Sequence, residues 1–200
     1  REGAIAGGFA EKIFAAEDAG DLPPGIAAPL VRSFIRGGVD TTIAGLGFTF
    51  NQLARNPDQY AIVHADTARS MAAFEEAIRH ESPAQVVFRT VREDMVFNGV
   101  RLEGDRKIGY FMGAANRDPL RFDDPDSYRV SRQSAGAHLA LGRGVHVCVG
   151  QQIARLEADC LVGAFARRVA AFEPAGTPVY RPTNALRTLE SLPLRITART

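Results

Sequence analysis

The stretch that decides the fold is Leu141-Gly142-Arg143-Gly144-Val145-His146-Val147-Cys148-Val149-Gly150. Its three glycines allow the backbone to pass close to a flat or bulky group. A helical pattern follows directly, over about 151–171, so Cys148 comes just before the N-terminus of that helix. The helix dipole and the free amides at such an end stabilise a thiolate. The stretch therefore predicts a cysteine whose sulfur does chemistry.

A lone thiolate presented in this way suits an axial haem ligand, which pushes electron density onto the iron and favours O–O cleavage. The alternative for a bare Gly-x-x-x-Cys pattern is a glycine turn around a buried, inert thiol. A phosphate-binding loop fits less well, because it would need a third glycine where Val147 stands. Zinc-finger spacing is also missing among the histidines and cysteines nearby, which are His138, His146, Cys148 and Cys160.

Composition excludes several classes of protein. The 200 residues include 24 Lys and Arg against 23 Asp and Glu, with 46% hydrophobic residues, which excludes a disordered chain, a fibrous rod and a disulfide scaffold. The net charge of +1 provides no field for nucleic acid or anionic lipid. No apolar run approaches the roughly 20 residues that cross a bilayer. The two cysteines form no framework, so we expect a reducing, cytoplasmic setting without nucleic-acid or membrane partners.

Two shorter motifs become informative only in combination. Glu76-Ala77-Ile78-Arg79 places a carboxylate and a guanidinium on one helix face, although such a pair alone usually marks a solvated face. Gly37-Gly38-Val39-Asp40-Thr41-Thr42 lies inside a long helical pattern, where two glycines allow a local opening of the helix. The hydroxyl beside the carboxylate can relay protons. A tolerated glycine pair, a threonine bonded back to a carbonyl and a surface Asp40 are the alternative.

The periodicity predicts helices with a few short strands. Asn98-Gly99, between two apolar runs, is the strongest hairpin signal. A final turn is expected near Glu190-Ser191. The expected elements are a long helix over about 26–55, a helix over 68–80, a β region over 86–112, a meander over 116–134, the cysteine loop 139–150, a helix over 151–171 and a β-hairpin over 186–197.

In their order along the chain these motifs resemble the cytochrome P-450 family of haem-thiolate monooxygenases. The long helix comes first, followed by Glu-x-x-Arg, a strand with Arg89, Asn116-Arg117-Asp118-Pro119 and the cysteine loop. The resemblance implies a mainly α fold with small β-sheets, an α+β protein. It covers the chain from about residue 20 to its end. We therefore expect residues 1–200, which begin at Arg1, to be the C-terminal half of one domain of a soluble bacterial enzyme.

The resemblance implies that the loop holds haem b. Cys148 matches the iron ligand, in a loop shaped by Gly142, Gly144 and Gly150. The family usually has Phe where this chain has Leu141, so the packing of the loop and the iron potential are expected to shift.

Other matches surround this loop. Glu76 and Arg79 match a buried structural pair, with Arg132 as its third member. Arg89 and His146 match partners of the haem propionates, since both donate hydrogen bonds to carboxylates. The remaining matches are Asp40 and Thr41, an acid–alcohol pair that supplies protons for the cleavage of dioxygen.

A narrower resemblance points to bacterial enzymes that oxidise para-substituted benzoates such as 4-methoxybenzoate. Arg32 and Ser33 could hold a carboxylate, unless Arg32 faces solvent. Arg36 stands where a small residue is expected, so it could add a carboxylate partner, pair with Asp40 or block the pocket. Val87 stands where a bulky aromatic is expected, and the substrate could therefore be larger or different. The runs that carry the resemblance are Leu30–Phe34, Phe74–Ala77, Gly113–Pro119 and Leu189–Pro193.

The implied reaction inserts one oxygen atom from O₂ into a small organic substrate, by hydroxylation or O-demethylation. The chain carries no flavin or nicotinamide fingerprint, so electrons are expected from NAD(P)H through a reductase and a ferredoxin. Arg143 is the candidate docking charge, and its alternative is a haem-side or solvated arginine. Two other readings stay open: a truncated, non-catalytic cytochrome P-450 fragment, and a haem-binding protein without turnover.

Overall fold

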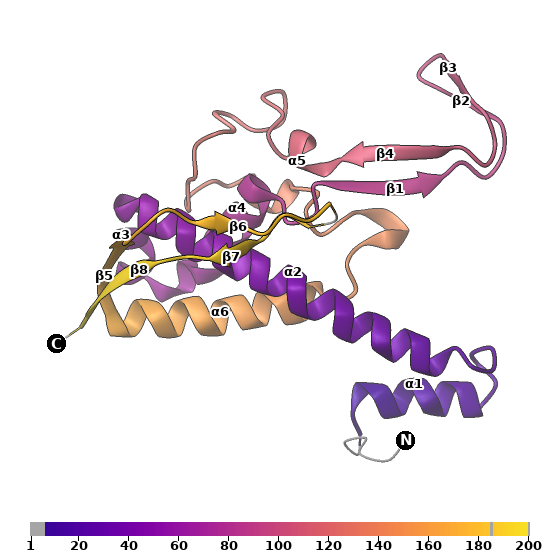
Figure 1. The fold of residues 1–200 in the computed structure, drawn as a ribbon, viewed down its shortest axis with the longest axis horizontal. Coiled ribbons are helices and arrows are strands. Elements are labelled where there is room, and N and C mark those ends of the chain that lie inside the picture. The colour runs from indigo at the N-terminus through magenta and orange to yellow at the C-terminus, as the bar shows by residue number, and fades with distance from the viewer. Residues whose placement is uncertain (1–6, 185, 200) are drawn as a thin grey trace. The chain divides into compact units, whose positions relative to one another are not determined.

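The computed structural model describes residues 7–184 and 186–199, a mainly helical chain with small two-stranded sheets (Figure 1). This confirms the expected α+β class. The helices are α1 (Phe9–Asp18), α2 (Ala27–Arg55), α3 (Pro57–Ala65), α4 (Ser70–Glu81), α5 (Met112–Ala115) and α6 (Gln151–Arg168). The strands are β1 (Val86–Thr90), β2 (Met95–Phe97), β3 (Val100–Leu102), β4 (Lys107–Phe111), β5 (Val169–Pro174), β6 (Val179–Tyr180), β7 (Leu189–Ser191) and β8 (Leu194–Ala198).

The chain divides into two compact units within α2, between Asp40 and Thr41. In the first unit, the ring of Phe9 meets the ring of Phe34 edge-on, with centroids 4.4 Å apart, and this contact joins α1 to the start of α2. The second unit contains the rest of α2 and all later elements. We describe each unit by itself.

The core of the second unit lies where α3, α4, α6 and β5 meet the end of α2. Tyr60 donates from its hydroxyl to the carbonyl of Val169 at 2.7 Å, so its polar end is satisfied inside the core. On α6, Ile153 and Leu156 are more than 60% exposed, whereas Phe165 packs against the core. Small residues instead let α6 approach α4, and the buried ones are Ala158, Val162, Gly163 and Ala166.

The end of α2 packs on α4 through a glycine. Gly45 is buried, and a methyl group built on it would lie 2.9 Å from Cε2 of Phe74 and 3.1 Å from Cγ2 of Ile78. Both side chains belong to the core and are almost fully buried. The close approach of the two helices therefore depends on the missing side chain.

The β region forms two antiparallel pairs. β1 pairs with β4, in a register that sets Val87 opposite Tyr110, and β2 pairs with β3. Asn98 and Gly99 both have positive φ, 49° and 78°, which is the geometry of the two-residue turn that their sequence predicts. Figure 1 shows the β2–β3 hairpin beyond the end of the pair at which β1 finishes and β4 begins.

The end of the chain differs from the sequence expectation in two places. The helix expected over 151–171 ends at Arg168, because Val169 turns extended and β5 pairs with β8. The hairpin expected over 186–197 is wrong, since β7 contains Glu190 and Ser191 and pairs with β6. Pro193 lies between β7 and β8, and its carbonyl accepts from the amide of Ala175. The two strands therefore join different sheets, a choice made by tertiary pairing.

Replacing Gly45 with Ala should lower the free energy of unfolding by about 1–3 kcal/mol, because Phe74 and Ile78 must move to admit the methyl group. Gly47→Ala is the matched control on the same helix. Its methyl group would lie 3.7 Å from Leu189, an ordinary contact. The free energy of unfolding should therefore rise by up to about 1 kcal/mol, because alanine has the higher helix propensity. Urea denaturation measures the free energy of unfolding of both variants. A Gly45→Ala variant more stable than the wild type would contradict the close packing of α2 on α4.

Candidate functional site

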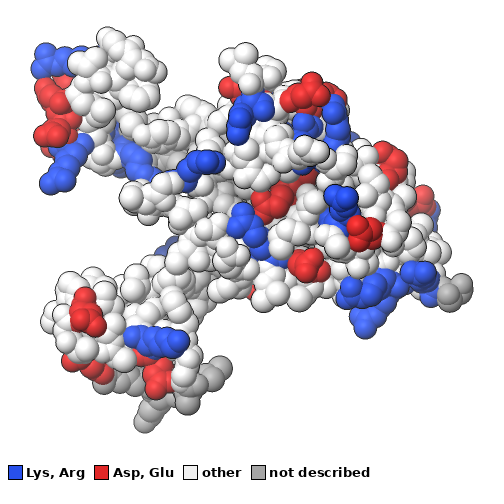
Figure 2. All heavy atoms as spheres, turned by 180° about the vertical axis from the view of Figure 1, so that it is seen from behind, with Lys and Arg blue, Asp and Glu red and all other residues white. Residues whose placement is uncertain are grey.

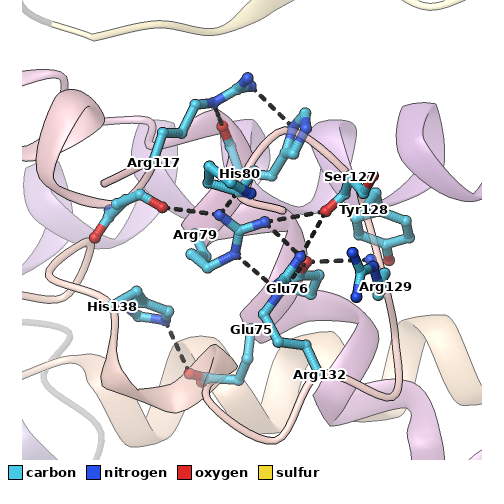
Figure 3. Close-up of polar contacts among 12 residues, drawn as sticks. Glu75, Glu76, Arg79, His80, Arg117, Ser127, Tyr128, Arg129, Arg132 and His138 are labelled. Atoms are coloured by element: carbon cyan, nitrogen blue, oxygen red, sulfur yellow. Dashed lines mark hydrogen bonds and ion pairs between the residues drawn. The ribbon is translucent and has the colours of Figure 1, made fainter. Parts of the chain in front are cut away.

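Glu76 and Arg79 form an ion pair whose side chains are both fully buried. Nε of Arg79 lies 2.8 Å from Oε2 of Glu76, and Nη2 lies 2.9 Å from Oε1. The remaining N–H groups of Arg79 donate to three main-chain carbonyls, so every donor of the guanidinium is used (Figure 3). Those carbonyls belong to Asn116, Pro125 and Ser127.

Arg132 joins this pair. Its Nε lies 2.8 Å from Oε1 of Glu76, and its Nη groups donate to the carbonyls of Asp123, Asp124 and Ser127. The segment 116–134 contains no helix or strand, so its carbonyls need donors from side chains. The buried ion pair and Arg132 supply them, which explains how an irregular segment keeps one conformation.

Asn116 connects the ion pair to the cysteine loop, a role that sequence reasoning missed. It is fully buried and accepts from Arg79 with its carbonyl. Its Nδ2 donates to Ser82, and its Oδ1 accepts from the amide of Leu139 at 2.7 Å. Its place in the Asn-Arg-Asp-Pro run was the only available signal, and that run does not show which loop the side chain reaches.

The cysteine loop depends on its glycines. Gly142 and Gly144 have φ of 71° and 68°, and a methyl group on Gly142 would lie 2.9 Å from the carbonyl oxygen of His146. The amide of Cys148 donates to the carbonyl of Leu141 at 2.8 Å, which closes the loop. Gly150 caps the start of α6. These contacts hold the half-buried thiol of Cys148 just before the helix N-terminus.

The surroundings of the thiol suit a flat apolar group held by one sulfur. Val145 is 97% exposed and Val149 is 74% exposed on either side of Cys148, and apolar surface of this kind is costly to leave in water. Within residues 7–184 and 186–199, no group of three His, Cys, Asp or Glu side chains could hold a metal ion. The thiol of Cys148, just before a helix N-terminus and between exposed apolar side chains, fits the sulfur ligand of a haem iron.

The other predicted residues of the second unit lie at its surface. Arg89 is exposed on β1 and donates to the carbonyl of Phe88. His146 is exposed in a short 3-10 turn of the cysteine loop, and Arg143 is exposed just before that turn. Val87 is half-buried, and Thr41 is exposed at the point where the unit begins.

The first unit contains the remaining predicted residues. Arg32, Arg36 and Asp40 are exposed along α2. Ser33 donates its hydroxyl to the carbonyl of Pro29 at 2.9 Å. The roles of these residues at the site stay predictions.

The sequence profile of the cytochrome P-450 family matches residues 26–173. The chain belongs to the cytochrome P-450 family. It is 47% identical over 191 residues to cytochrome P-450 CYP199A2 of Rhodopseudomonas palustris, covering 96% of this chain and 46% of that protein. It is 37% identical to cytochrome P-450 107B1 of Saccharopolyspora erythraea, covering 90% of this chain and 45% of the relative. The tirandamycin C-bound structure of the P-450 monooxygenase TamI superposes with a TM-score of 0.85 at 32% identity, covering 92% and 47%.

The chain thus spans less than half the length of the curated relatives that it matches. Cytochrome P-450 proteins bind haem b through a cysteine thiolate, which agrees with the thiol and the apolar surface found here. In the described part of the chain, no helix is long and apolar enough to cross a membrane.

Replacing Glu76 with Gln should lower the free energy of unfolding by about 3–5 kcal/mol, because two buried arginines lose their counter-charge. The control is Glu173→Gln, which breaks an exposed pair with Arg195 and should cost less than about 1 kcal/mol. Chemical denaturation of both variants measures the contrast. Equal losses would show that burial does not set the strength of the Glu76 contacts.

Proposed function

We propose that this chain carries the haem-holding and proton-delivering part of a monooxygenase that inserts one oxygen atom from O₂ into a small organic substrate. The observation that carries the proposal is the half-buried thiol of Cys148 at the start of α6, in a loop anchored to the Glu76–Arg79 pair through Asn116. Membership of the cytochrome P-450 family supports it.

Each residue of the loop has a chemical task in this proposal. Cys148 binds the haem iron as a thiolate, which the positive end of the α6 dipole stabilises. A methyl group on Gly150 would lie 3.9 Å from the sulfur, while the positive φ angles of Gly142 and Gly144 shape the loop around it. Bound there, haem supplies the site at which dioxygen is reduced and cleaved. Arg89 and His146, both exposed, bind the propionates.

Asp40 and Thr41 deliver protons in the proposed reaction. They are neighbours on α2, and both are exposed, so a proton can reach the carboxylate from solvent and pass to the hydroxyl. Gly37 and Gly38 precede them in the same helix, and a methyl group on either glycine would meet no atom within 4 Å.

The proposed substrate is a para-substituted benzoate such as 4-methoxybenzoate. The sequence resemblance and the 47% identity to CYP199A2 support this class. Arg32 and Arg36 are exposed cations suited to the carboxylate, while the Ser33 hydroxyl keeps acceptor capacity after donating to Pro29. Val87 would contact the aromatic ring.

Electrons reach the haem from NAD(P)H through a reductase and a ferredoxin in the cytoplasm, with Arg143 as an exposed docking charge. Figure 2 shows Lys and Arg side chains interspersed with Asp and Glu over much of the face in view. Interspersed charges of this kind provide no uniform field for a nucleic acid, so docking of an acidic ferredoxin rests on Arg143 itself.

A second function is a haem-binding protein without turnover, or a non-catalytic fragment. The ferrous–CO difference spectrum separates an empty protein from a haem protein. NADH consumption and product formation with 4-methoxybenzoate, a ferredoxin and its reductase then separate an enzyme from a binder.

Replacing Cys148 with Ala should abolish the thiolate-type absorption band of the ferrous–CO complex, because no other sulfur lies in the loop. Cys160→Ala is the control, since this second cysteine is exposed on α6. It should retain the band at full intensity. Persistence of the band in Cys148→Ala would refute the ligand assignment.

Replacing Thr41 with Ala should retain haem but divert reducing equivalents to hydrogen peroxide, because the hydroxyl that passes the proton is lost. Product formed per NADH should fall about tenfold or more. Thr177→Ala, at an exposed position outside every helix and strand, is the control. Tight coupling in Thr41→Ala would remove this residue from the proton path.

A further inference from the structure

Glu75 is a buried carboxylate that the mechanism above does not use. It is 8% exposed, and it precedes Glu76 on α4. Consecutive residues of an α-helix point about 100° apart. Glu76 therefore faces Arg79 and Arg132, while Glu75 faces the cysteine loop and α6.

The two oxygens of Glu75 hold two different segments. Oε2 lies 2.9 Å from Nε2 of His138, just before the cysteine loop (Figure 3). Oε1 accepts from Nε of Arg155 at 2.6 Å, one turn into the helix that follows the loop. Both ends of the segment that carries Cys148 are thus tied to one carboxylate.

The contacts of His138 determine its orientation. Its Nδ1 lies 3.1 Å from the amide nitrogen of Ala140 and accepts that hydrogen bond, so Nε2 bears the proton that it donates to Glu75. The ring is 5% exposed. It transmits the position of Glu75 to the backbone of Ala140, next to Leu139, whose amide is held by Asn116.

Hydrogen bonds and the charge of Arg155 favour the ionised form of Glu75. Burial alone would raise the pKa of Glu75, but the hydrogen bonds from His138 and Arg155 and the charge of Arg155 outweigh it, and the pKa lies below its ordinary value. Arg155 is itself oriented by Gln151, which accepts from Nη1 at 2.7 Å. Gln151 is the first residue of α6.

Apolar packing joins the start of the loop to α6, where Ala140 and Leu141 pack against a cluster that contains Ala158. A hollow of about 340 Å³ lies between the loop and the helix, lined on the loop side by Leu141, Gly142 and Val147 and on the helix side by Gln151 and Arg155. Space of this size lets a glycine-containing loop shift without a clash. Polar contacts at the two ends therefore act together with the packing of Ala140 and Leu141 to set its position.

We propose that Glu75 is a positioning residue for Cys148, acting through His138 at one end of the cysteine loop and Arg155 at the other. The clamp sets where the loop presents its sulfur and how firmly it stays there. This inference rests on the proposed role of Cys148 as the haem ligand. The clamp itself can be tested without haem.

The first test is amide hydrogen exchange in the protein without haem. Glu75→Gln keeps the size of the side chain but removes the charge and one of the two acceptors. Exchange at Leu139, Ala140 and Cys148 should become about tenfold faster or more. The amide of Val91, directly after β1, donates to the carbonyl of Arg106, and its exchange rate should not change.

Two further variants keep the result decisive. Glu157→Gln removes a carboxylate from an exposed position of α6 and should leave all these rates unchanged. Arg155→Gln alters a side chain that is 24% exposed, so it serves if Glu75→Gln does not fold. The proposal would be overturned if all three loop amides exchanged at the wild-type rate in Arg155→Gln. It would also be overturned if the amide of Val91 exchanged faster by the same factor as the loop amides.

The second test uses the haem-loaded protein. In Glu75→Gln the thiolate-type ferrous–CO band should decay several-fold faster than in Glu157→Gln, and the haem midpoint potential should shift. An unchanged band and potential would overturn the positioning role. If instead the loop loosens in Glu75→Gln while the band persists in Cys148→Ala, the clamp stands and the ligand assignment fails.

Discussion

The structure depends on a carboxylate buried with its guanidinium. Glu76 and Arg79 are withdrawn from water completely, and such a pair is tolerated only when every remaining donor and acceptor is satisfied. Arg79 meets this condition by donating to carbonyls of a segment without regular secondary structure. The conformation of that segment is therefore a consequence of the ion pair, and through Asn116 the consequence extends to the cysteine loop.

Helix α4 distributes these constraints in two directions. Its neighbouring carboxylates organise different segments, Glu76 the irregular region and Glu75 the two ends of the cysteine loop. Any rotation of α4 would disturb both sets of contacts at once. The close packing of Gly45 against Phe74 and Ile78 limits that rotation, which links the core to the position of the thiol.

Much of the local structure follows from the sequence. Pro57 ends α2 and begins α3, and the positive φ angles of Asn98 and Gly99 are ones that asparagine and glycine adopt readily. The sequence does not predict the structure correctly where tertiary contacts compete with a local pattern. The residues after Arg168 continue a helical pattern, yet pairing with β8 makes them a strand. In α6 the large apolar residues Ile153 and Leu156 are exposed, since close contact with α4 selects small ones.

By itself the sequence determined the family, the glycine-shaped cysteine loop and the helix that begins beside Cys148, because these features are encoded within a few consecutive residues. Only the tertiary structure decided that His138 and Arg155, 63 and 80 residues from Glu75, converge on its carboxylate. The physical reason is that a local pattern records which faces are apolar. It does not record which buried charge will meet which donor once the helices pack.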